Sequence, residues 1–166
     1  MYRGKGFTYI WMLFAVALAG IMLAGAGQVW RTESLREKEK ELMFVGEQFR
    51  QAIGSYYESS PGMFKRYPDS LEKLLSDDRF PTVKRHLRKI FFDPVTGTAE
   101  WGLVRQPGIG ITGVYSLSTQ KPIKRANFPE RYSSFAKAAS YKDWKFVYSP
   151  ASLSSATLQS QSQPQS

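Results

Sequence analysis

The chain has 166 residues, about the length of one domain. It has no cysteine, which excludes disulfides, thiolate catalysis and cysteine-based metal sites, and its one histidine, His86, excludes a multi-histidine metal site. The net charge of +9 lies mainly after residue 60, because residues 61–150 carry sixteen Lys and Arg against eight Asp and Glu, a balance of +8.

The N-terminal part of the chain is apolar. Residues 6–30 contain no charged side chain, and the run from Phe7 to Trp30 would form a helix roughly 36 Å long at about 1.5 Å per residue. A bilayer core about 30 Å thick needs roughly 20 apolar residues, and a helix satisfies its own backbone hydrogen bonds there. Arg3 and Lys5 precede the run without an acid, so we expect a single-pass membrane protein with its N-terminus in the cytoplasm.

A secretory signal peptide is the alternative interpretation of this segment. A basic start, an apolar core and Ala24-Gly25-Ala26 together resemble a signal with an A-x-A cleavage site. Against it, the apolar run is longer than the usual core of about 7–15 residues and continues past that site to Trp30. Cleavage there would release a soluble periplasmic protein that begins at Gly27. A lipoprotein is excluded because the chain has no cysteine.

The helix is expected to continue from Arg31 to Tyr57. This segment contains no proline, and Ser59-Ser60-Pro61-Gly62 ends the pattern. Its large apolar side chains recur at steps of three or four, which predicts one buried stripe: Leu42, Val45, Phe49, Ile53 and Tyr56 or Tyr57. Phe7 to Tyr57 would then be one helix of about 50 residues, whose second half must pack against the rest of the chain.

Residues 61–150 show a mixed pattern. A short helix is expected at 70–77 after Tyr67-Pro68, a second in the basic stretch 82–89, and three strands at 99–105, 111–117 and 144–148. We therefore predict an α+β fold in which a small antiparallel sheet packs on the long helix. Four aromatic residues are assigned to the core: Trp101, Trp144, Phe146 and Tyr148. The uncharged Ser- and Gln-rich tail, residues 151–166, is expected to be disordered.

The start of the chain resembles a known processing signal. Arg3-Gly4-Lys5-Gly6-Phe7-Thr8, a short basic leader before an uninterrupted apolar helix, is similar to the class III signal peptides of type IV pilins and type II secretion pseudopilins. Gly20 matches a glycine common in the mature helix of that family. Three later parts look like the G-type major pseudopilin: Glu47–Tyr57 with Tyr67-Pro68, Asp93–Gly97 before a Trp-containing strand, and Val114–Ser118.

This resemblance implies that prepilin peptidase cuts the bond between Gly6 and Phe7 at the cytoplasmic face of the membrane. Arg3 and Lys5 would hold the leader, residues 1–6, at that face. Glycine before the cut lets the backbone enter a tight site without a Cβ clash. Phe7 would be the first residue of the mature chain and its site of N-methylation.

The resemblance also implies a structural role. Residues 7–30 would stay in the bacterial inner membrane as the assembly helix, and residues 31–150 would form a pilin-like domain in the periplasm. The implied partners are other pilin-like subunits, prepilin peptidase and the assembly platform of the inner membrane. No nucleophile–base pair and no metal-ligand cluster is visible, so we expect no catalytic residue, no metal and no cofactor.

Two features of the expected assembly helix bear on packing. The family usually has Glu at the fifth mature position, where this chain has Trp11, as in the tip-type pseudopilin. Trp11 offers no carboxylate to a neighbouring subunit's N-terminal amine. Small residues at helical spacing allow helices to approach closely: Ala15 with Ala19, and Gly20 with Ala24.

The calcium loop of G-type pseudopilins needs a cluster of acidic residues. After Glu100 this chain has only two separate acids, Glu130 and Asp143, so we predict no calcium site.

Two further motifs can be interpreted either as structural features or as binding sites. Gly108–Gly113 fits G-x-G-x-x-G, but β-like residues follow it, which favours a turn between strands over a dinucleotide site. A basic run follows residue 82: Lys84, Arg85, Arg88 and Lys89. It could hold DNA phosphates, as in a DNA-binding minor pilin of an uptake apparatus, or lie near anionic lipid headgroups. The favoured interpretation is a solvent-exposed helix face that binds nothing. For His86 we expect an exposed or partly buried side chain with no catalytic partner.

Overall fold

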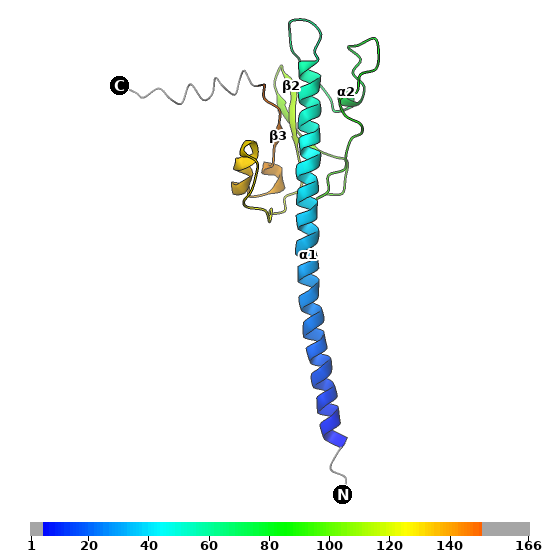
Figure 1. The fold of residues 1–166 in the computed structure, drawn as a ribbon, viewed down its shortest axis with the longest axis vertical. Helices are drawn as coiled ribbons and strands as arrows, with labels where there is room; N and C mark the ends of the chain where they lie inside the picture. The colour runs from blue at the N-terminus through cyan, green and yellow to red at the C-terminus, as the bar shows by residue number, and fades with distance from the viewer. Residues whose placement is uncertain (1–4, 151–166) are drawn as a thin grey trace, which may run out of the picture. The chain divides into compact units, whose positions relative to one another are not determined.

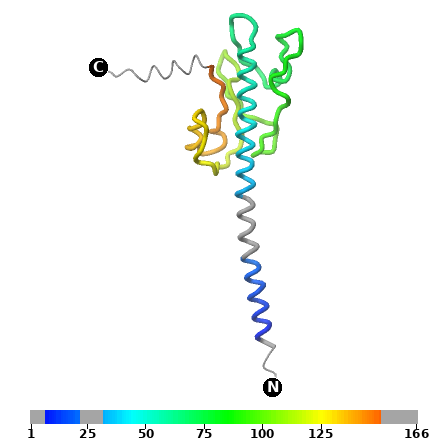
Figure 2. The backbone as a smooth tube through the Cα atoms, in the orientation of Figure 1, coloured from blue at the N-terminus to red at the C-terminus, as the bar shows by residue number. Residues whose placement is uncertain are grey.

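The computed structural model describes the backbone of residues 5–150 and the side chains of residues 7–21 and 32–150. The tail predicted at 151–166 and the first four residues of the leader lie outside this range. By its internal contacts the chain separates into two units, residues 1–37 and residues 38–166, and each is considered by itself. Figure 2 traces the backbone and draws in grey the residues whose placement is uncertain.

The described chain has an α+β architecture (Figure 1). Its elements follow in the order α1 (Lys5–Glu58), α2 (Glu72–Leu75), β1 (Gly102–Gln106), β2 (Gly110–Tyr115), the 3-10 helices η1 (Glu130–Lys137) and η2 (Tyr141–Asp143), and β3 (Phe146–Val147). The coarse fold class is therefore confirmed, with one helix of 54 residues and a small antiparallel sheet.

The first unit contains the N-terminal part of α1, which includes the described part of the predicted assembly helix. The second part of that segment, including Ala24, lies outside the described side chains. Among the residues whose side chains are described, no helix combines the length and the apolar character that crossing a membrane requires.

The second unit is built on one face of α1. The predicted stripe is confirmed, because Leu42, Val45, Phe49, Ile53 and Tyr56 are all buried. The Phe49 ring lies 5.0 Å from the Trp101 ring and 6.3 Å from the Phe91 ring, measured between centroids. Each fully buried side chain of this size contributes about 1.5–3 kcal/mol, so this stripe is the main hydrophobic contribution of α1 to the unit.

The sheet has the strand order β1-β2-β3, and both pairs are antiparallel. Gly102 pairs with Tyr115, and Val114 pairs with Phe146. The turn between β1 and β2 needs glycine because Gly108 and Gly110 have φ of +72° and +120°, a region that L side chains rarely adopt. The start of the glycine-rich motif thus forms a turn between strands, as predicted, and the rest of the motif, from Gly110, belongs to β2.

The turn at Asp93–Gly97 is also confirmed, and it holds the far end of β2. The buried Asp93 carboxylate accepts a hydrogen bond from the Val95 N–H at 2.8 Å and another from the Ser116 hydroxyl at 2.6 Å. The Gly97 N–H donates back to the Asp93 carbonyl at 2.7 Å. One carboxylate therefore closes the turn and ties it to the residue after β2.

The helix expected at 82–89 is wrong. Its N–H groups are used elsewhere, since those of His86 and Leu87 donate to the Leu74 carbonyl at 2.8 and 2.9 Å. The Asp77 N–H donates to the Lys84 carbonyl at 2.9 Å. The segment therefore folds against the end of α2, which is shorter than the helix expected at 70–77.

The 3-10 helices η1 and η2, which the sequence pattern did not predict, contribute to an aromatic cluster. The Phe135 and Trp144 rings are stacked, with centroids 5.3 Å apart and planes 8° from parallel. Phe146 meets Phe135 edge to face at 5.4 Å. Trp101, Trp144 and Phe146 are buried as predicted, whereas Tyr148 is only partly buried.

Replacement of Gly46 by alanine is expected to destabilise the second unit. A Cβ at this position would lie 2.4 Å from the ring of Phe146, which is fully buried and has no room to move. Alanine favours helix by about 1 kcal/mol, but a contact this short places the overpacking cost in the upper part of the usual range, about 2–3 kcal/mol. We expect a net loss of about 1–2 kcal/mol in the free energy of unfolding, measured by urea denaturation of the full chain in mild detergent.

Glu41→Ala is the matched control because Glu41 is exposed on the same helix. It should change the free energy of unfolding by no more than about 0.5 kcal/mol. A Gly46→Ala variant as stable as the wild type would contradict the packing of Phe146 against α1.

Candidate functional site

The predicted processing site lies at the start of α1. Arg3 is outside the described residues, and Lys5 and Gly6 belong to α1 but their side chains are not described. The Phe7 side chain is 71% exposed. The structure therefore places the proposed first mature residue on a helix and leaves its leader untested.

The described residues of the predicted assembly helix form an apolar surface. Every side chain from Phe7 to Ile21 is exposed, including the small residues Ala15 and Ala19. Trp11 is 61% exposed, and a Cβ added at Gly20 would meet nothing within 4 Å. A run of exposed side chains that is almost entirely apolar suits packing against another molecule or against lipid.

The predicted basic run does not form one face of a helix. Its four members are exposed, in a segment without regular structure: Lys84, Arg85, Arg88 and Lys89. The Lys84 ammonium donates to the Ser59 hydroxyl at 2.9 Å, and the Lys89 ammonium lies 5.3 Å from the Phe91 ring centroid. The two lysine side chains thus contact different neighbours, Ser59 and Phe91.

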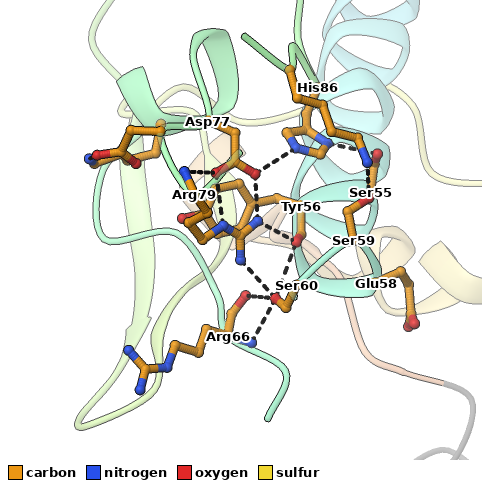
Figure 3. Close-up of polar contacts among 12 residues, drawn as sticks. Ser55, Tyr56, Glu58, Ser59, Ser60, Arg66, Asp77, Arg79 and His86 are labelled. Carbon is orange, nitrogen blue, oxygen red and sulfur yellow. Dashed lines mark hydrogen bonds and ion pairs between the residues drawn. The ribbon is translucent and has the colours of Figure 1, made fainter. Parts of the chain in front are cut away.

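A polar network at the C-terminal end of α1 was missed by the sequence analysis (Figure 3). Arg79 donates from Nε and Nη2 to the two oxygens of the buried Asp77 carboxylate, at 2.8 and 2.6 Å. Its other bonds reach α1 and the loop that follows it, with Nη2 on the Tyr56 carbonyl at 2.9 Å and Nη1 on the Ser60 hydroxyl at 2.8 Å. The guanidinium also lies 3.5 Å from the centroid of the Tyr56 ring. Arg79 therefore satisfies the end of the helix and fixes the loop that contains Asp77.

His86 joins the same network through two side-chain partners that the sequence analysis did not predict. Its side chain is fully buried, with Nε2 3.1 Å from the Asp77 carboxylate and Nδ1 2.8 Å from the Ser55 hydroxyl. Because a carboxylate only accepts, Nε2 carries the proton and Nδ1 accepts from Ser55. Figure 3 shows this chain running from α1 through His86 to Asp77.

Ser55, His86 and Asp77 have the residue types of a hydrolytic triad, but the site has no free N–H groups beside Ser55 to form an oxyanion hole. Ser55 lies inside α1, where the neighbouring backbone N–H groups are used by the helix and are not available to an oxyanion. Arg79 also neutralises Asp77, which weakens its support for a charged imidazole. The arrangement is a structural clamp between α1 and the loop at 77–86.

The charges in this network follow from its contacts. The hydrogen bond from Arg79 lowers the pKa of Asp77 to about 2, against the opposing effect of burial. Burial lowers the pKa of His86, and the hydrogen bond to Asp77 only partly offsets it. At neutral pH the network therefore contains an Asp77–Arg79 ion pair and an uncharged His86.

No local pattern in the sequence pointed to this network. Asp77 and Arg79 look like part of a charged loop. Tyr56, which bonds Arg79, and Ser55, which bonds His86, are each more than twenty residues away from their partners. The one available signal was that His86 is the sole histidine. Within the part of the chain that the structure describes, no group of three or more His, Cys, Asp or Glu could hold a metal ion.

Comparison with known proteins adds no family to these observations. No protein-family model matches the chain, and no significant match was found among curated proteins or solved structures. The fold itself defines the class: an α+β protein in which a small antiparallel sheet and short helices cover one face of a long helix.

His86 gives the protein a specific dependence of stability on pH. The folded state holds His86 neutral with a lowered pKa, so the unfolded state takes up a proton first as the pH falls below 6.5. We expect the free energy of unfolding to fall between pH 7.5 and 5.5, at up to about 1.4 kcal/mol per pH unit. Urea denaturation at several pH values measures this slope.

The His86→Gln variant is the control, since glutamine does not titrate and the terminal amine is common to both chains. Its slope in the same pH window should be close to zero, because Asp77 contributes only as the pH falls from 3.8 toward about 2. An equal slope in the two proteins would show that His86 is not held neutral by burial.

Proposed function

We propose that the chain is a pilin-like structural subunit, a pseudopilin, of a type II secretion or type IV pilus-related machine. Prepilin peptidase cuts it between Gly6 and Phe7, and it assembles through its N-terminal helix. It resides in the bacterial inner membrane as a single-pass protein, with its N-terminus in the cytoplasm and the domain from residue 31 in the periplasm. It acts as a structural component and not as an enzyme.

The observation that carries this proposal is the contrast along α1. From Phe7 to Ile21 the side chains are almost all apolar, and all are exposed. In the second unit the same helix buries one stripe, Leu42 to Tyr56, under a small sheet. Exposed apolar surface of that extent marks an interaction site or a membrane segment. An assembly helix uses the same surface twice, against lipid before assembly and against the helices of other subunits afterwards.

The exposed small residues support a packing role. Ala15 and Ala19 are one helical turn apart, and Gly20 has open space around its Cα. In lipid, close approach at small side chains is a main source of helix association. Trp11 supplies no carboxylate for the N-terminal amine of a neighbour, so in this chain the contact between helices would depend on close packing at the small residues.

The sequence of the native N-terminus tests the processing step. We expect the mature chain purified from its own membranes to begin at Phe7, because the peptidase removes the leader and leaves the helix. Gly6→Leu should block the cut and retain residues 1–6, since a Cβ at the cleavage site obstructs the peptidase. A mature chain that begins at Gly27 would contradict the proposal and support a secreted periplasmic protein.

Disulfide cross-linking tests the assembly step, because the chain has no cysteine of its own. Ala19→Cys should form linked dimers in oxidised membranes. Adding Ala15→Leu to that variant should lower the linked fraction about threefold or more by separating the helices. Val16→Leu, which adds bulk beside the predicted contact, is the matched control and should leave the fraction unchanged. Equal loss with both leucines would contradict packing through the small residues.

A further inference from the structure

Two neighbouring segments at the C-terminal end of α1 are strongly basic. Residues 59–66 and 79–85 together carry five Lys and Arg and no Asp or Glu. Hydrogen bonds from Lys84 to Ser59 and from Arg79 to Ser60 hold the two segments next to each other. Figure 1 shows their loops at the same end of the second unit.

Apolar side chains project from the tips of these segments. Met63 and Phe64 are 92% and 80% exposed, directly after Gly62, whose φ of +82° makes the turn. Val83, in the other segment, is 64% exposed. A single exposed apolar residue needs no explanation, but three on two hydrogen-bonded basic loops offer apolar contacts at one end of the second unit.

Two of the five cations on these loops, Arg66 and Arg85, are available to a partner. Arg79 is neutralised by Asp77, and Lys65 lies 3.7 Å from Glu58. Arg66 and Arg85 are exposed, and among the residues that the structure describes neither guanidinium has a hydrogen-bond or ion-pair partner. A guanidinium offers a planar set of donors that fits phosphate oxygens.

A cleft of about 880 Å³ lies beside the first segment and extends the basic surface. It is lined by five cationic side chains, including Arg66 and Arg105, and by the carboxylates of Asp69 and Asp78. The Ile111 N–H bonds the Pro68 carbonyl at 2.9 Å, and Arg105 bonds the Asp69 carbonyl at 3.2 Å. These bonds fix the walls of the cleft before a ligand arrives, which lowers the entropy cost of binding.

We propose that this end of the second unit binds an anionic phospholipid surface. Met63, Phe64 and Val83 enter the boundary between headgroups and acyl chains. Arg66, Arg85 and the cleft contact the lipid phosphates. Apolar insertion combined with cations at headgroup level is the physical basis of interfacial membrane binding. The contact is independent of the proposed assembly helix, because it uses residues of the second unit alone.

Vesicle capture tests the proposal with the full chain. The protein is placed in nanodiscs of phosphatidylcholine, so that lipid surrounds its N-terminal helix, and is immobilised. Vesicles of phosphatidylcholine and phosphatidylglycerol at about 7:3 should bind it, whereas pure phosphatidylcholine vesicles should bind weakly. Arg66→Gln/Arg85→Gln should lower the association about thirtyfold, and Met63→Ser/Phe64→Ser should lower it about tenfold or more.

Matched controls alter exposed residues elsewhere in the second unit. Lys121→Gln/Lys142→Gln makes the same change in charge, and Phe44→Ser/Phe92→Ser makes the same change in apolar surface, and neither should reduce capture. Equal capture of neutral and anionic vesicles, or loop variants that bind like the controls, would overturn the proposal. If only the cation variant loses binding and polyglutamate or glycerol 3-phosphate displaces the vesicles, the surface takes a soluble anion or an acidic polypeptide, and the lipid proposal is wrong.

Discussion

Covering the apolar stripe of α1 is the constraint on which the second unit depends. Among the described residues the cover has three short strands and a few short helices, and the N–H groups of Ile123 and Lys124 lie outside any strand. A side chain bonds them instead. The buried Glu39 carboxylate accepts from the N–H groups of Ile123 and Lys124, at 2.6 and 3.1 Å, and from the Tyr141 hydroxyl at 2.9 Å. An unpaired buried donor costs about 1–3 kcal/mol, so one residue of α1 fixes two distant segments.

The opposite end of the stripe is held by the network around Arg79. A helix ends with carbonyls that have no partner within it and carry a partial negative charge. Arg79 and Lys65 donate to the carbonyls of Tyr56 and Glu58, respectively, so cations supply what the helix lacks. Asp77 then neutralises Arg79 inside the protein. This clamp also sets the position of the two basic loops, which links the stability of the fold to the surface proposed to meet lipid.

The proposed role as a pilin-like subunit rests on how one helix is divided. Its N-terminal part, from Phe7 to Ile21, has side chains that the protein itself leaves exposed. From Leu42 onward the helix is the core of a small domain. A subunit that moves from lipid into a bundle of sibling helices needs the first part uncovered and the second part stable by itself. The basic loops would add a separate contact with anionic lipid, made by the domain.

Local patterns in the sequence determined much of this protein. The spacing of Leu42 to Tyr56 predicted the buried stripe, the glycines at 108–113 predicted a turn, and alternation predicted the three strands, because each depends on residues close together in the chain. Only the tertiary structure decided that His86 is buried between Ser55 and Asp77 and that 82–89 is not a helix. Those outcomes depend on hydrogen bonds between segments that no periodicity relates, so burial and partner geometry, and not composition, settled them.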